Sequence, residues 1–141
     1  MLDFKTKFGR FAMKSIKGEY FIWLTTVDSK GTPQPRPVWS IWENDTFLVY
    51  SQAKAHKLKH IQNNPNVSLH FNSADEKGEE RLIIFTGVAK IDQVCPPTDK
   101  HRAYMRKYKS GIIGLNATPE QFADEYSIAI RITPVNLRGS E

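Results

Sequence analysis

The spacing of the apolar residues changes near Glu19 and divides the chain into two parts. Residues 1–18 place apolar side chains close to helical spacing, with basic residues between them, which predicts a short amphipathic helix. Its apolar positions are Phe4, Phe8, Phe11 and Ile16. From Glu19 onward, short β-rich runs alternate with turn signals. We therefore expect a helix over residues 1–18, packed on a single mainly β domain that spans residues 19–141.

About six runs are rich in β-branched and aromatic residues and are predicted as antiparallel strands. They are residues 20–27, 33–42, 46–50, 66–72, 82–92 and 127–133. Short turns join the first three runs, so we expect these to form a three-stranded meander. Gly31 suits a positive φ in the first turn, and Gly87 marks a bulge or bend in the fifth run.

The second run carries three prolines, Pro33, Pro35 and Pro37, at alternate positions. Residues two apart in a strand point their backbone donors toward the same edge, so all three missing N–H groups fall on one side. The other side can still pair with the first run, whereas the proline side cannot form a regular ladder. We therefore expect an edge strand that leaves room for a loop, a ligand or a partner subunit.

Three segments between the strands are predicted as helices. The first spans about residues 55–64, the second runs from a cap at Thr98 or Asp99 to about Lys109, and the third starts after Thr118. The second is expected to turn Ala103, Tyr104 and Tyr108 inward and to be followed by a loop through Gly111 and Gly114. The third has a capping Thr, a Pro at the first helical position and a Gln three residues after the cap.

With 141 residues and a mass of 16.2 kDa, the chain has the length of one domain. Its 40% hydrophobic and 25% charged residues are typical of a globular protein. The apolar stretches are too short for a membrane-spanning helix, so we expect no membrane partner and a cytoplasmic location. The single cysteine, Cys95, provides neither an internal disulfide nor a thiolate-rich metal site. Redox chemistry would therefore need a bound cofactor.

The net charge of +5 is concentrated at the start of the chain. The charged residues there are Lys5, Lys7, Arg10, Lys14 and Lys17 against Asp3. They contribute +4, which leaves the rest of the chain nearly neutral. We expect these lysines to be the solvated outer face of a packed helix, and contact with nucleic acid or a membrane is the alternative. No nucleic-acid partner is therefore predicted.

A second basic group surrounds the predicted start of the helix that follows Ser51 and Gln52. It consists of Lys54, His56, Lys57, Lys59 and His60. A helix N-terminus already carries partial positive charge, so lysines there are unfavourable unless an anion is bound. A phosphate or carboxylate would use the free backbone donors, the Ser51 hydroxyl and one or two ammonium groups together. Two interpretations remain open, an anion site and a set of solvated surface lysines.

Other chemistry finds less support in the sequence. His56 and His60 are four residues apart, but the adjacent lysines would repel a cation, so no metal site is predicted. The sequence contains no nucleophile-elbow, GxGxxG or P-loop pattern, and we predict no catalytic residue and no hydrolase. The tryptophans Trp23, Trp39 and Trp42 are interpreted as core or interface residues rather than a stacking platform for bases.

Five segments, in this order, resemble the pyridoxamine 5′-phosphate oxidase-like flavin-binding split-barrel superfamily. They are Trp23-Leu24-Thr25-Thr26-Val27, Gly31-Thr32-Pro33-Gln34-Pro35-Arg36-Pro37-Val38-Trp39, Tyr50-Ser51-Gln52, Lys57-Leu58 and Asn64-Pro65-Asn66-Val67-Ser68-Leu69. Within the superfamily, the chain is most similar to a small class described as deazaflavin-dependent, which uses coenzyme F(420). The later segments around Tyr108, Thr118 and Ile130 also fit, so the resemblance covers nearly the whole chain from Glu19.

The resemblance implies a mainly β fold, a split β-barrel of about six antiparallel strands with helices. It also implies a homodimer that holds coenzyme F(420) or FMN in a groove between its subunits. The implied cofactor-binding residues are Arg36, Val38, Trp39, Ser40, Ser51, Gln52, Lys54 and Lys57. Lys57 and Ser51 are expected at the phosphate with Lys54 or Arg36 in support, and Val38, Trp39 and Gln52 along the ring or its chain.

The implied function is hydride transfer from the cofactor to a small conjugated substrate. The alternative is a non-catalytic carrier of a flavin, a deazaflavin or haem. True pyridoxamine phosphate oxidases are longer and carry additional Arg and His residues near their C-terminus, whereas this chain ends soon after Arg138 without that pattern. Vitamin B6 synthesis is therefore not expected. FMN and the deazaflavin present a phosphate and a tricyclic ring to the same groove, and the subfamily match favours the deazaflavin.

Overall fold

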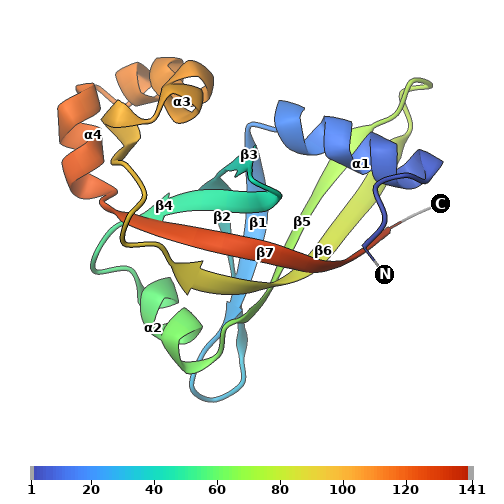
Figure 1. Ribbon diagram of the computed structural model, residues 1–141, viewed down its shortest axis with the longest axis horizontal. Coiled ribbons are helices and arrows are strands. Elements are labelled where there is room, and N and C mark those ends of the chain that lie inside the picture. Colours follow the sequence, from blue (N-terminus) through green and yellow to red (C-terminus); the bar gives the residue numbers. More distant parts are fainter. Residues whose placement is uncertain (1, 140–141) are drawn as a thin grey trace.

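The computed structural model describes residues 2–139, in which seven strands accompany four α-helices and one 3-10 turn (Figure 1). The helices are α1 (Lys7–Gly18), α2 (His56–Asn63), α3 (Arg102–Gly114) and α4 (Pro119–Glu125), and the 3-10 turn is η1 (Thr98–Lys100). The strands are β1 (Phe21–Val27), β2 (Pro33–Trp39), β3 (Ile41–Glu43), β4 (Thr46–Ser51), β5 (Asn66–Ala74), β6 (Glu80–Ile91) and β7 (Ile128–Gly139). No helix in the described part of the chain is long and apolar enough to cross a membrane.

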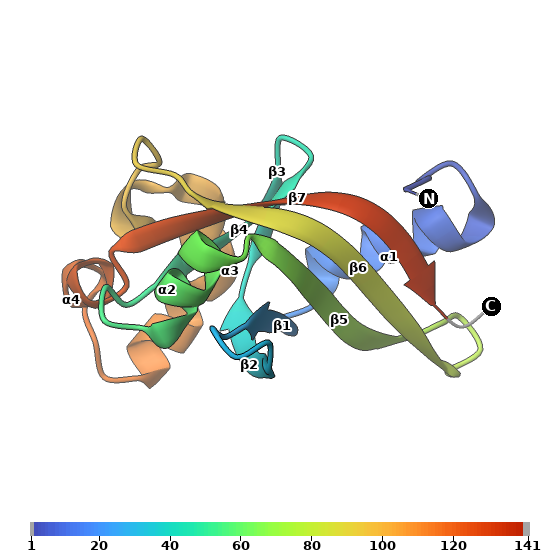
Figure 2. The same cartoon turned by 90° about the horizontal axis from the view of Figure 1, so that it is seen from below.

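The strands form one antiparallel sheet in the order β2-β1-β5-β6-β7-β4-β3. The long strands β5, β6 and β7 curve along the molecule, and the sheet curls around them into a split barrel (Figure 2). The predicted mainly β split barrel is confirmed. It has seven strands in the described residues rather than about six, because the second predicted run is divided in two.

The predicted three-stranded meander is wrong, because residues 33–42 are broken at Ser40 into β2 and β3. These two strands lie at opposite ends of the strand order, so the chain passes at Ser40 from one edge of the barrel to the other. The break has a specific cause. The Ser40 N–H donates to the Tyr108 hydroxyl (2.8 Å), and the Ser40 carbonyl accepts from the Lys107 ammonium (2.9 Å), instead of joining a ladder.

The proline-rich strand β2 is an edge strand, as its sequence predicts. In the described sheet it pairs only with β1, with Pro37 opposite Trp23 and Pro35 opposite Thr25. The turn between the two strands contains Gly31 at a φ of +80°, a conformation that favours glycine. The missing proline donors thus face the open side of the barrel.

The core consists of two clusters of buried side chains. The larger one fills the barrel and is covered by α1, whose Ala12 and Ile16 belong to it. The smaller one lies where α3 and α4 pack on the sheet, and it contains Tyr104, Tyr108 and Phe122. Figure 1 shows α1 at one side of the barrel and the pair α3 and α4 at the other. The functional candidates lie below this pair, near α2.

The helix α3 differs from its prediction at both ends. The turn η1 precedes it, and His101 caps it, so the helix begins at Arg102. It also continues through Gly111 into the expected loop, because glycine permits close packing there: a Cβ would lie 1.9 Å from the Tyr20 hydroxyl oxygen. Ala103, which was expected on the inner face, is exposed.

Several local predictions are confirmed. The Thr118 hydroxyl accepts the Gln121 N–H (3.1 Å), and the Gln121 side chain returns a bond to the Thr118 N–H (2.9 Å), so α4 has the predicted capping box. The β6 and β7 register shifts between Thr86 and Gly87, where the bulge is expected. In both cases the signal lies in the residues that form the feature itself.

Candidate functional site

A cavity of about 520 Å³ lies where the edge strand β2 faces the end of β4 and the start of α2. Its lining residues are Leu24, Thr26, Gln34, Arg36, Pro37, Ser51, Gln52, Ala55, His56, Lys57, His60 and Tyr126. Four of the predicted cofactor-binding residues are among them, namely Arg36, Ser51, Gln52 and Lys57. The fold therefore brings together residues from the three strands β1, β2 and β4 and from the helix α2.

The helix α2 begins at this cavity without a side-chain cap. Its N-cap residue is Ala55, whose side chain forms no capping bond in the described structure, and whose N–H donates to the Gln52 carbonyl (3.1 Å). The N–H groups of His56 and Lys57 follow in the first turn, where an α-helix supplies no acceptor. The start of α2 therefore offers backbone donors and the positive end of the helix dipole to the cavity.

Lys57 is a half-buried cation in this lining. Burial, and to a lesser degree the positive charge of Arg36, lowers the pKa of Lys57 below its usual value. The lining contains neither Asp nor Glu, and the salt bridges of the described residues include neither cation. Arg36 is exposed and Lys57 half-buried, and neither has a carboxylate beside it in the lining, so both charges would favour a bound anion.

Neutral hydrogen-bonding groups complete the lining. The Ser51 side chain is almost fully buried, and its hydroxyl donates to the Gln52 carbonyl (3.0 Å). The Gln52 amide donates in turn to the Glu125 carboxylate (2.9 Å), which holds that side chain at the rim. Thr26 Oγ1 and His60 Nδ1 lie 2.8 Å apart. These groups provide hydroxyl and amide contacts beside the two cations.

The other four predicted cofactor-binding residues do not line this cavity. Val38 is buried in the larger core cluster. Trp39 stacks on Tyr108 with ring centroids 4.7 Å apart and an interplanar angle of 6°, and it packs against the smaller cluster. Ser40 is buried and bonded to α3. Lys54 is exposed on the other side of the start of α2.

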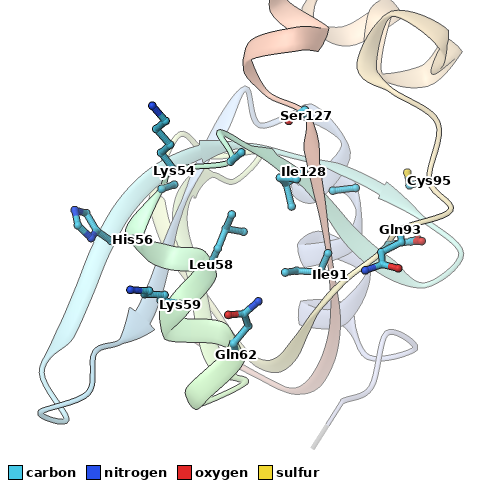
Figure 3. Close-up of a pocket in the computed structure, with 14 residues that line it drawn as sticks. Lys54, His56, Leu58, Lys59, Gln62, Ile91, Gln93, Cys95, Ser127 and Ile128 are labelled. Carbon is cyan, nitrogen blue, oxygen red and sulfur yellow. The ribbon is translucent and has the colours of Figure 1, made fainter.

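Lys54 lines a second cavity of about 710 Å³ between α2 and the ends of β6 and β7 (Figure 3). Leu58, Ile91 and Ile128 extend toward its centre, whereas the Lys54 side chain points away from it. The lining of this second cavity includes the carboxylate of Asp92, which would repel an anion, whereas the first cavity has no Asp or Glu in its lining. The first cavity is therefore the better anion site. Within residues 2–139, no group of three His, Cys, Asp or Glu side chains is placed to hold a metal ion.

The lining residues that were not predicted as cofactor-binding include the polar side chains of Thr26, Gln34 and Tyr126. Gln34 could have been found, because it lies two positions before Arg36 and strand alternation turns both to the same side. Thr26 could have been found in the same way from the inward-facing side of β1. Tyr126 follows α4, and no local signal brings it to α2.

Two sequence comparisons bear on the chain as a whole. A family model described as Pyridoxamine 5′-phosphate oxidase matches residues 11–139. No curated protein matches the chain in sequence.

Solved structures of the same fold cover nearly the whole chain. A conserved hypothetical protein from Mycobacterium tuberculosis has a TM-score of 0.72 and 19% identity, over 96% of this chain and 85% of that one. An F(420) reductase has a TM-score of 0.63 and 19% identity, over 89% and 94% of the two chains. HutZ, a haem storage protein from Vibrio cholerae, has a TM-score of 0.61 and 15% identity, over 96% and 93%. At these identities the likeness shows the fold alone.

Proposed function

The chain belongs to the pyridoxamine 5′-phosphate oxidase family, and we propose that it is an oxidoreductase that binds a phosphorylated flavin or deazaflavin. The cofactor would be coenzyme F(420) or FMN, and its phosphate would lie in the cavity between β2 and the start of α2. One observation carries the proposal: Lys57 and Arg36 share this cavity without a carboxylate. The proposed substrate is a small conjugated molecule that accepts a hydride.

A phosphate group fits the donors that line the cavity. Lys57 would supply a point charge and Arg36 a planar pair of N–H donors, which are complementary ways to bind phosphate oxygens. The first N–H groups of α2 add neutral donors, and the Ser51 hydroxyl would add another by rotating away from the Gln52 carbonyl. Gln52 at the rim is placed to contact the chain that joins the phosphate to the ring. Each of these groups comes from the described residues and needs no rearrangement of the fold.

A bound flavin or deazaflavin supplies the hydride chemistry itself. The residues of this chain would fix the phosphate and so fix the position of the ring relative to the substrate. Leu24 and Pro37 form apolar parts of the lining. This cavity is assigned to the phosphate rather than to the reacting ring, so none of its lining residues is assigned as a catalytic acid.

A homodimer is part of the proposal, and the outer face of the sheet supports it. Phe21 and Trp23 on β1 are 52% and 40% exposed, and Leu82 and Val88 on β6 are 48% and 41% exposed. The pairing registers place Trp23, His70 and Ile84 in one row across β1, β5 and β6. Positions 21–25, 66–72 and 82–88 on this face carry no Lys, Arg, Asp or Glu. A broad uncharged face of this kind is typical of a subunit contact.

The dimer can be tested separately from the cofactor. We expect the wild-type protein to sediment as a dimer and Trp23→Lys to shift it toward the monomer, because a charge would be buried in the contact. Ser29→Lys, in the exposed turn between β1 and β2, adds the same charge and should leave the dimer intact. A wild-type monomer at all concentrations would contradict this part of the proposal.

A second candidate function is a carrier that holds a flavin, a deazaflavin or haem without turnover. The described lining accounts for holding a phosphate and identifies no side chain in contact with a substrate, so it fits binding without turnover equally well. HutZ, which shares the fold, is described as a haem storage protein.

The experiment that tests the proposed function is a titration of the purified protein with oxidised F(420), FMN, riboflavin and haem. We expect F(420) or FMN to bind more tightly than riboflavin, which lacks the phosphate. The reduced cofactor is then incubated anaerobically with quinones and enones. An oxidoreductase would accelerate reoxidation, whereas a carrier would slow it. Equal affinity for FMN and riboflavin, together with no binding of F(420), would contradict the proposal.

A further inference from the structure

The two edges of the barrel are tied together at Ser40. This residue is the whole connection between β2 and β3, which lie at opposite ends of the strand order. Its side chain and backbone are buried, at 2% exposure, and it belongs to no strand. Its N–H and carbonyl therefore need hydrogen-bond partners from outside the sheet.

The helix α3 provides these partners through two adjacent side chains. The Tyr108 hydroxyl accepts the Ser40 N–H (2.8 Å) and donates to the Tyr20 carbonyl (2.5 Å). The Lys107 ammonium donates to the Ser40 carbonyl (2.9 Å). Tyr108 is fully buried, and its ring stacks on Trp39. One tyrosine therefore joins the residue before β1 to the residue after β2, and we call this arrangement the Tyr108 joint.

The joint anchors one end of the hairpin formed by β1 and β2, whose other end is the exposed turn at Gly31. The three prolines leave β2 without a strand on its outer side. Arg36 stands on β2 between the joint and the turn. Lys57 lines the same cavity from α2, which meets the hairpin where Thr26 Oγ1 and His60 Nδ1 lie 2.8 Å apart. The separation of the two cations therefore depends on where the hairpin is held.

We infer that Tyr108 is a positioning residue for the proposed phosphate site, because its hydroxyl fixes the hairpin that carries Arg36 opposite Lys57. The inference rests on the proposed function. It adds a residue outside the cavity that determines how strongly a phosphorylated ligand is preferred over its dephosphorylated form.

The test compares the affinities of FMN and riboflavin, which differ only in the phosphate, for the wild type and for Tyr108→Phe. The variant keeps the ring that stacks on Trp39 and removes only the hydroxyl. We expect the preference for FMN to fall roughly threefold or more, with the affinity for riboflavin unchanged. Tyr104→Phe is the matched control, because the described residues give its hydroxyl no bond to Ser40 or Tyr20.

Arg36→Met completes a double-mutant cycle. If Tyr108 acts through Arg36, then adding Tyr108→Phe to Arg36→Met lowers the preference for FMN no further. The inference would be overturned if Tyr108→Phe lowered the unfolding temperature but left the preference for FMN unchanged. It would also be overturned if Tyr108→Phe lowered this preference equally in the wild type and in Arg36→Met. If the wild type itself does not prefer FMN, the proposed function fails and the inference with it. Should Tyr108→Phe not fold, Lys107→Met removes the second bond between α3 and Ser40, the one to the Ser40 carbonyl, and is judged by the same ratio of FMN to riboflavin affinity.

Discussion

Replacing Lys57 by methionine separates a binding role from a structural role. In a structural role, the ammonium would stabilise the fold through an ion pair, but the described salt bridges do not include Lys57. In a binding role, the ammonium is held ready for an anion and contributes nothing favourable before the anion arrives. Methionine preserves most of the length and the apolar stem of lysine, so Lys57→Met removes little besides the charge.

The two effects of Lys57→Met have opposite signs. Burial and the charge of Arg36 lower the pKa of Lys57, so the charged form is disfavoured in the folded protein. Removing this charge should therefore leave the free energy of unfolding at pH 7 unchanged or increase it. In the complex, the ammonium would donate a charge-assisted hydrogen bond worth about 1.5–3 kcal/mol. Its loss corresponds to binding that is about 10- to 150-fold weaker.

The assay is a fluorescence titration with FMN and riboflavin, paired with urea denaturation of the ligand-free protein. Lys59→Met is the matched control, because it removes the same charge from an exposed position on the same helix. We expect only Lys57→Met to weaken FMN binding, and neither variant to change the affinity for riboflavin. The wild-type affinity for FMN should also fall as the pH rises through the lowered pKa of Lys57. An equal loss of FMN affinity in Lys57→Met and Lys59→Met would refute the reasoning. A Lys57→Met protein with a lower free energy of unfolding than the wild type would also refute it.

Three further predictions concern the fold around the site. Among the described residues, the buried Thr98 hydroxyl has no hydrogen-bond partner. Thr98→Val should therefore raise the free energy of unfolding, measured by urea denaturation, by about 1 kcal/mol. A lower free energy of unfolding in this variant would contradict the prediction. A Cβ at Gly111 would lie 2.9 Å from the Trp39 ring, whereas one at Gly114 meets nothing within 4 Å. Gly111→Ala should therefore be less stable than Gly114→Ala by about 1–3 kcal/mol. Equal melting temperatures of the two variants would contradict this prediction. Burial lowers the pKa of Lys107 to about 8, so between pH 8 and pH 10 the unfolded state binds more protons and the wild type should gain stability relative to Lys107→Met. Parallel curves of unfolding free energy against pH would exclude this shift.

Local sequence patterns predicted the elements whose cause lies within a few residues. The alternate prolines of β2 identify an edge strand because each proline removes a ladder hydrogen bond at its own position. The cap at Thr118 depends on Gln121, three positions away. The break at Ser40 could not be predicted in this way, because its partner is the hydroxyl of Tyr108, 68 positions later in the chain. The sequence 33–42 alone is compatible with one continuous strand.

The candidate site likewise contains features that could be expected from the sequence and features that depend on the fold. Arg36, Ser51, Gln52 and Lys57 were expected together from the family resemblance, and the structure places them in one cavity. Lys54 is only three residues from Lys57, yet it lines the cavity on the other side of α2. Residue type and spacing cannot distinguish the two lysines, because the distinction depends on where the helix begins and which strands pack on it.

The most direct measurement of the central claim is a crystal structure of the protein with FMN or coenzyme F(420) bound. The account predicts phosphate oxygens about 2.7–3.2 Å from the Lys57 ammonium and the Arg36 guanidinium, within the cavity between β2 and the start of α2. A ring bound elsewhere, or a phosphate that points into solvent while the two cations stay without a partner, would contradict it.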